Sequence, residues 1–146
     1  MIRRPWIDSK PKRWGVDQRR YRMHLAKIRS RLPRRLCEFV DRFSLHDDCL
    51  ASLSVIPDLP SGRDALVSVY LYRTGSVAAV ALLVLHFVGL RGALKQLPLP
   101  SEIMYFDVEE IRGGVLRMGF MMDGHRSWHV TFRDFDFSVH EYEQRA

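Results

Sequence analysis

The spacing of hydrophobic residues changes once along this chain, near residue 48. Before that point apolar side chains recur every three or four positions, which is typical of one face of a helix. After it, apolar residues rich in β-branched and aromatic types alternate with polar ones, as in strands. The sequence therefore predicts a helical N-terminal part followed by a β-rich part.

Two helices are expected between residues 17 and 42. Asp17 is a good helix cap, and the apolar face that follows consists of Tyr21, Leu25, Ile28 and Leu32. Pro33 interrupts this face. Because proline is tolerated in a first turn, we expect a second helix to begin there. That helix would bury Leu36, Phe39 and Val40. A single kinked helix is the alternative.

Turn-forming residues separate six β-rich runs, which favours sequential hairpins. The runs are 50–56, 66–72, 77–88, 102–109, 115–122 and 128–139. In the last run the apolar residues fall on even positions as far as Phe132 and on odd positions from Phe135. A β-bulge or a break near Arg133 and Asp134 would keep both sets on the core side. The predicted fold class is α+β, with two N-terminal helices packed on a mostly antiparallel, curved sheet of about six strands.

The length of 146 residues fits one domain. Residues 1–16 contain Pro5, Pro11 and Gly15 without a helical period, so we expect a basic, extended leader. Residues 17–146 would form a single α+β domain, with helices over 17–42 and the sheet over 48–142.

Positive charge is concentrated in residues 1–42. This arm holds 14 of the 23 Lys and Arg residues but only 4 of the 17 Asp and Glu residues, so the rest of the chain is mildly acidic. The asymmetry predicts an acidic partner, which could be a nucleic acid, a membrane surface, another protein or the chain's own body. The candidate contacts to phosphates or to an acidic partner are Arg3, Arg4, Lys10, Lys12, Arg13, Arg19, Arg20 and Arg22. The aromatic residues among them, Trp6, Trp14 and Tyr21, could stack on bases.

No segment predicts a membrane span or a secretory signal. The longest apolar run, 77–90, is shorter than the ~20 residues of a spanning helix and contains His86, so we expect it to belong to the core. The basic N-terminus is not followed by the apolar stretch of a signal peptide, so we expect a cytoplasmic protein with no membrane partner. Cys37 and Cys49 are the only cysteines, and we expect them to be reduced.

The stretch FSLHDDC places an imidazole and two carboxylates where the helical part meets the strands. Aspartate favours turns because its side chain hydrogen-bonds to nearby backbone groups, so His46, Asp47 and Asp48 are interpreted as structural. A catalytic or metal role would need a second cluster beside them. His125 and His129 have the spacing of a helical zinc site, but along a strand this spacing corresponds to ~13 Å.

Other catalytic and binding motifs are missing from the sequence. It has no glycine-rich nucleotide-binding motif, no nucleophile elbow and no paired CxxC. We therefore expect no catalytic residues, no metal and no cofactor. One further acidic cluster consists of Asp107, Glu109 and Glu110. On a strand Asp107 and Glu109 share a face, which we expect to be solvated; the alternative is a docking surface for a basic partner, including the chain's own Arg-rich helix.

Three segments in order carry a resemblance: LPRRLCEFVDRFSLHDDCLASLSV, LLVLHFVGL and HVTFRDFDFSVHEY. Over residues 20–142 the chain resembles small bacterial domain families of unknown function, with a helix, a Leu-His-Asp junction and a β-rich body that ends in an acidic-aromatic strand. Leu45, His46 and Asp47 match this junction, whereas Asp48 stands where a small or aliphatic residue is expected. The leader and the Arg-rich helix also depart from the pattern. The resemblance implies no established activity, and some similar domains are immunity or accessory proteins of bacterial toxin systems.

Three functions remain, in order of preference. The first is a non-enzymatic protein-binding domain, such as an immunity or accessory protein, that uses its sheet face or acidic edge. The second is a nucleic-acid-associated protein that uses residues 1–22. The third is a hydrolase built on His46 and Asp47.

Overall fold

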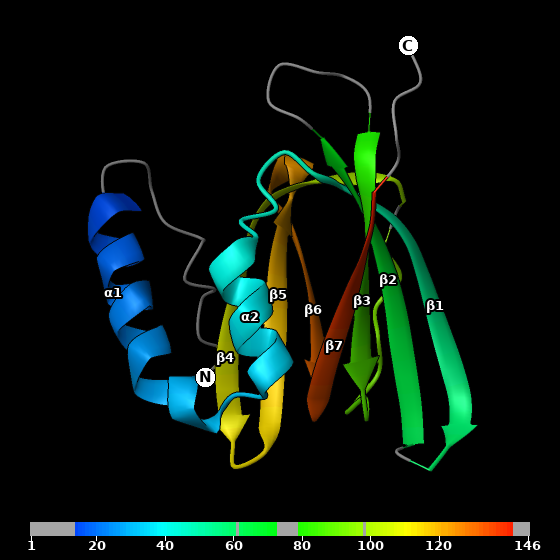
Figure 1. The fold of residues 1–146 in the computed structure, drawn as a ribbon, viewed down its shortest axis with the longest axis horizontal. Helices are drawn as coiled ribbons and strands as arrows, with labels where there is room; N and C mark the ends of the chain where they lie inside the picture. Colours follow the sequence, from blue (N-terminus) through cyan, green and yellow to red (C-terminus); the bar gives the residue numbers. More distant parts are fainter. Residues whose placement is uncertain (1–13, 61, 73–78, 98, 142–146) are drawn as a thin grey trace.

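Two helices precede seven antiparallel strands in the computed structural model (Figure 1), which describes residues 14–60, 62–72, 79–97 and 99–141. Helix α1 is Trp14–Ile28, a short 3-10 helix follows at Arg29–Arg31, and α2 is Arg34–Arg42. Pro33 is the N-cap of α2, so the prediction of two helices is confirmed and the single kinked helix is wrong.

The start of α1 corrects two predictions. Residues 14–16 are helical and not part of an extended leader, and Asp17 lies inside the helix instead of capping it. A single glycine, here Gly15, costs only about 1 kcal/mol in a helix and does not stop it. Residues 1–13 of the predicted leader lie outside the described residues.

The strands number seven and not about six. They are β1 Cys49–Leu59, β2 Gly62–Tyr72, β3 Ala79–Val88, β4 Ser101–Arg112, β5 Val115–Met122, β6 Arg126–Phe132 and β7 Asp134–Glu141. The last predicted run is two strands because the chain breaks at Arg133, whose N–H donates to the Val88 carbonyl at 2.9 Å. The change of parity predicted this break, and Phe132 and Phe135 on its two sides are both buried.

The strand order is β6-β5-β4-β1-β2-β3-β7. The sheet has two parts, β1-β2-β3-β7 and β4-β5-β6, which are joined by the pairs Cys49 with Glu102 and Leu50 with Ser101. As predicted, consecutive strands pair as hairpins from β1 to β3 and from β4 to β6. Strand β7 instead returns to pair with β3. The sheet is therefore curved, and its two end strands follow each other in the chain.

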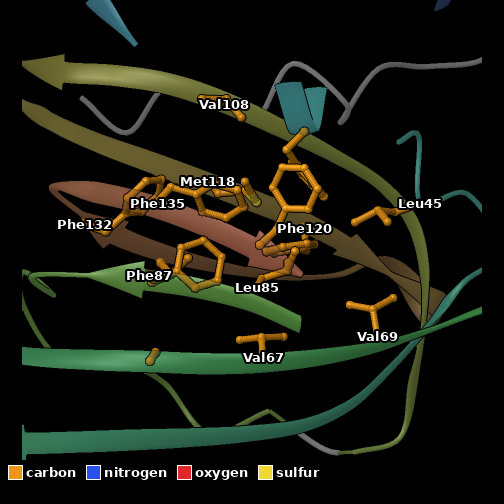
Figure 2. Packing of buried hydrophobic residues seen from close by; sticks show 14 of the residues in the cluster. Leu45, Val67, Val69, Leu85, Phe87, Val108, Met118, Phe120, Phe132 and Phe135 are labelled. Carbon is orange, nitrogen blue, oxygen red and sulfur yellow. The ribbon is translucent and has the colours of Figure 1, made fainter. Parts of the chain in front are cut away.

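The hydrophobic core lies between the two parts of the sheet and α2. In Figure 2, Val67, Leu85 and Phe87 of one part point toward Met118 and Phe120 of the other. Phe39 of α2 is fully buried, as predicted, and its ring centroid lies 5.3–5.7 Å from those of Phe106, Phe135 and Phe137. Helix α1 lies beside β4, at the opposite end of the molecule from β1 (Figure 1). No helix in the described ranges is long and apolar enough to cross a membrane.

Candidate functional site

The His-Asp-Asp junction, residues 46–48, lies alongside strand β4. Leu45 and Asp47 both have positive φ, 58° and 66°, and this sharp turn buries the Leu45 side chain. Hydrogen bonds then join the junction to β4: Asp47 N–H donates to the Ile103 carbonyl, and Ile103 N–H donates to the Asp48 carbonyl. The junction thus pairs with β4 like a short strand.

The His46 ring completes this pairing. Its Nδ1 lies 2.8 Å from the Met104 carbonyl oxygen, and the ring stacks on Tyr105 with centroids 5.3 Å apart. Since a carbonyl can only accept, Nδ1 carries the proton. The Asp47 carboxylate lies 3.5 Å from His46 Nε2. These contacts hold the ring against β4, as the structural interpretation expects.

Among the side chains that the structure describes, no three His, Cys, Asp or Glu residues gather as metal ligands. His129 lies on β6, where burial together with the charges of Arg117 and Lys95 lowers its pKa. The side chain of His125, which we expected not to share a metal with His129, lies outside the described residues.

The acidic cluster on β4 is not a solvated face. Asp107 is 0% exposed and Glu109 is 7% exposed, so the expectation for these two residues was wrong. The reason is that α1 lies over this side of the sheet, where the Tyr21 hydroxyl accepts the Val108 N–H at 2.9 Å. Burial raises the Tyr21 pKa, and the charges of Asp107 and Glu109 raise it further, against the effect of the Val108 N–H.

Strand β5 provides the groups that accommodate these carboxylates. Arg117 lies opposite Glu109 in the β4–β5 hairpin and pairs with it at 2.7 Å. Gly119 lies opposite Asp107, and a Cβ atom at Gly119 would lie 2.5 Å from Asp107 Oδ1. The sequence did not predict either pair. Counting from the turn at Gly113 and Gly114 would place Arg117 opposite Glu110, but an irregularity between Glu110 and Arg112 shifts the register by one residue.

In the described part of the basic arm, most arginines of its second half form ion pairs. The ion pairs there are Arg29–Asp41, Arg31–Glu110, Arg34–Glu38, Arg35–Glu38 and Arg35–Asp136. In contrast, Arg19, Arg20 and Arg22 are exposed on α1 and have no acidic partner in the described part of the chain. The candidates Arg3, Arg4, Lys10, Lys12 and Arg13 lie outside it. Of the acidic cluster on β4, Glu110 pairs with Arg31 of the 3-10 helix of the same chain.

The solvent side of β1, β2, β3 and β7 forms a second surface, which we call the open face. Its members follow from the strand register, since alternate residues of each strand point into the core. They are Cys49, Ser52, Ser54, Ile56, Asp64, Leu66, Ser68, Tyr70, Leu82, Val84, His86, Val88, Asp134, Asp136, Ser138 and His140. No described helix or strand packs across this face, and only Arg35 of α2 reaches its border, at Asp136.

The centre of the open face combines apolar side chains with serines, since Val84 lies between Ser68 and Ser138 in the strand register. Tyr70 pairs with Leu82 across β2 and β3, and it is 40% exposed. Leu66, Leu82 and Val84 are each partly exposed. Beside them His86 Nε2 lies 2.8 Å from the buried carboxylate of Asp64. The open face contains neither Lys nor Arg, although the chain has 23 of them.

Comparison with known proteins identifies no relative: no protein-family model, no curated protein and no solved structure matches this chain. The functional conclusion therefore rests on the residues and their geometry.

Proposed function

We propose that this chain is a non-enzymatic domain that binds another protein through the open face. The observation that carries the proposal is that three apolar side chains, Tyr70, Leu82 and Val84, are neighbours on this face. The solvated face of an antiparallel sheet normally carries polar side chains opposite the core. A contiguous apolar area at the surface instead marks an interaction site.

Charge defines the chemistry of the partner. The border of the open face carries Asp134 and Asp136 on β7, and the face has no basic side chain apart from its histidines. A complementary surface would therefore have an apolar centre and a neutral or basic rim. The specific form of the proposal is an immunity or accessory protein of a bacterial toxin system, because the junction and β-rich body resemble those families.

The test uses a charge placed at the centre of the open face. The Val84→Lys variant should lose a partner that the wild-type protein captures from its native lysate after nuclease treatment. The matched control is Ser127→Lys, which adds the same charge at an exposed position of β6. Both variants are first shown to be folded by circular dichroism. A partner retained by Val84→Lys, or lost equally from both variants, would refute binding through this face.

As a second candidate we infer that α1 binds nucleic acid. The specific observation is that Arg19, Arg20 and Arg22 are exposed without an acidic partner in the described residues, unlike the arginines of the second half of the arm. Exposed guanidinium groups without an acidic partner can neutralise phosphates, which releases counterions from the nucleic acid.

Fluorescence anisotropy with labelled oligonucleotides at several salt concentrations tests this second function. Replacing Arg19 and Arg22 by Gln should weaken binding and flatten its dependence on salt, because fewer phosphates are neutralised. The Arg34→Gln control also removes exposed charge, but from a residue that is paired with Glu38. Equal losses in the double variant and the control, or no binding at physiological salt, would exclude the assignment to α1.

A further inference from the structure

Every sheet leaves strand edges with unpaired backbone groups, and this chain covers three of its edges itself. Strand β4 is covered by α1, β6 by the loop after β3, and β7 by α2. The hydrogen bonds are Val108 N–H to Tyr21 Oη, Arg91 N–H to the Thr131 carbonyl and Arg35 Nη2 to the Phe137 carbonyl, at 2.9, 2.9 and 2.6 Å. Covering an edge in this way prevents pairing with another chain.

Within the described ranges, one edge of strand β1 is not covered. It pairs with β4 only at Cys49 and Leu50, and beyond these residues no described group hydrogen-bonds to its outer side. The bare edge is regular from Ser52 to Ile56, between two irregularities of the β1–β2 register. Pro57, which has no N–H, follows this stretch and limits pairing beyond it.

The side chains of this bare edge do not oppose pairing. The stretch SLSVI, residues 52–56, carries no charge, whereas natural edge strands are often protected by lysine. Val55 is 43% exposed, although it belongs to the side of the strand that faces the core. An uncharged strand edge with an exposed branched side chain is suited to β-augmentation by another strand.

The position of β1 favours a second copy of the same chain. With a net charge of +6, two copies repel each other most where their basic arms meet. In Figure 1, α1 and β1 lie at opposite ends of the molecule. Two copies that meet at β1 therefore keep their α1 helices far apart and bring their uncharged residues 52–56 together.

We propose that β1 pairs antiparallel with β1 of a second copy, about a twofold axis that passes through residues 52–56. This arrangement is self-complementary, as a twofold interface requires. It joins the two β1-β2-β3-β7 sheets and makes their open faces continuous. The pairing is independent of what the open face binds, so either proposal can fail alone.

Sedimentation equilibrium of the full chain tests the proposal across micromolar to millimolar concentrations. The wild-type protein should show a monomer–dimer equilibrium. Ser54→Lys should weaken self-association about tenfold or more, because like charges then face each other across the edge. Ser127→Lys, with the same added charge on β6, should leave it unchanged. Salt should not weaken the dimer, whereas association of an arm with an acidic surface would weaken as salt is raised.

Amide hydrogen exchange on the wild-type protein provides a readout that does not depend on a variant. Exchange at residues 52–56 should slow as the protein concentration rises. Any one of four results would overturn the proposal. The wild-type protein could be monomeric at every concentration, or Ser54→Lys could retain the dimer. The dimer could dissociate when salt is added, or exchange at 52–56 could be independent of protein concentration.

Discussion

Asp107 shows how a single residue on one strand determines what its neighbour can be. Its carboxylate is fully buried and occupies the space above Gly119, which no other residue type would leave empty. A buried charge is tolerated only where partners and space are provided for it. Glycine is therefore suited to position 119 because it has no side chain, and not because its backbone is flexible.

Gly119→Ala should destabilise the protein by about 1–3 kcal/mol, since the added methyl group would lie 2.5 Å from Asp107 Oδ1 and the buried Asp107 side chain would have to move. Chemical denaturation measures the change. In an Asp107→Ala background the same substitution should cost much less, because the clash is gone. Gly113→Ala is the control, since a methyl group there would have no atom within 4 Å. Equal costs in both backgrounds would show that the two residues do not interact.

His46 is the second residue whose role the geometry defines. His46→Ala should lower the free energy of unfolding by about 1 kcal/mol, through loss of the hydrogen bond to the Met104 carbonyl. His46→Asn can keep a donor near the Nδ1 position and should recover part of this loss. Thermal or chemical denaturation checks both values. An unchanged stability accompanied by lost partner binding would contradict the structural role.

The sequence predicted the surroundings of individual residues less well than it predicted the strands. The turn at His46 to Asp48 was predicted from its aspartates, and a backbone hydrogen bond from the Asp48 N–H to the Leu45 carbonyl closes it. The burial of Asp107 and Glu109 could not, because it depends on α1 packing over β4, which no local pattern encodes. The expectation that the apolar run 77–90 belongs to the core is wrong for Leu82 and Val84, which lie on the open face. An apolar run without alternation predicts a strand with apolar groups on both sides but not what covers them.

Among the elements, α1 depends most on a few specific contacts. Ile28 is its only buried apolar residue among the side chains described, and the Tyr21 hydroxyl bonds directly to β4. The pKa of Tyr21 is raised by burial and by the neighbouring carboxylates. Above about pH 10 the unfolded chain releases the phenol proton and the folded chain retains it. The contribution of Tyr21 to stability is therefore complete below this pH and falls as the pH rises.

Tyr21→Phe should remove this alkaline loss of stability, which amounts to about 1.4 kcal/mol per pH unit for each proton that only the unfolded chain releases. At neutral pH the variant should be less stable by about 1 kcal/mol, and the Val108 amide should exchange faster, because its acceptor is lost. Denaturation between pH 8 and 11 and amide exchange are the measurements. Wild-type and variant curves that remain parallel at high pH would show that this phenol does not titrate differently on folding.

The order of strands along the chain was more predictable than their pairing. Hairpins between consecutive strands follow from turn residues, and the break at Arg133 follows from the change of parity between Phe132 and Phe135. The pairing of β7 with β3 joins residues such as Phe137 and Leu85 that are far apart in sequence. Hydrophobic alternation predicts which side of a strand is buried but not which strand lies next to it.

Across the whole molecule, Phe39 links the two parts of the sheet, which pair directly only at Cys49 and Leu50 among the described strands. Its ring contacts Phe106 of β4 as well as Phe135 and Phe137 of β7, so one side chain of α2 connects both parts of the sheet. Aromatic pairs at these distances stabilise beyond the area they bury. Loss of this ring should therefore weaken the packing of both parts together.

Phe39→Ala should destabilise the protein by about 3–5 kcal/mol, because it leaves a cavity between α2 and both parts of the sheet. Unfolding followed by tryptophan fluorescence, with Trp128 buried on β6, should remain a single transition shifted to lower denaturant. Phe43→Ala is the comparison: this residue is half-buried and stacks on Phe39, so its loss should cost less. A smaller cost for Phe39 than for Phe43 would contradict the central position of the ring.

The pairing of β3 with β7 also has a consequence during synthesis on the ribosome. Strands β1 to β3 emerge first and can form their hairpins at once, but the free side of β3 has no partner until β7 has been translated. Over that interval the nascent chain presents an unpaired strand with Leu83, Leu85 and Phe87, which are fully buried in the finished protein. Unpaired strands and exposed apolar surface are the features that lead incomplete chains to aggregate and that chaperones bind. The delay before β7 appears is therefore the period in which this protein most needs such protection.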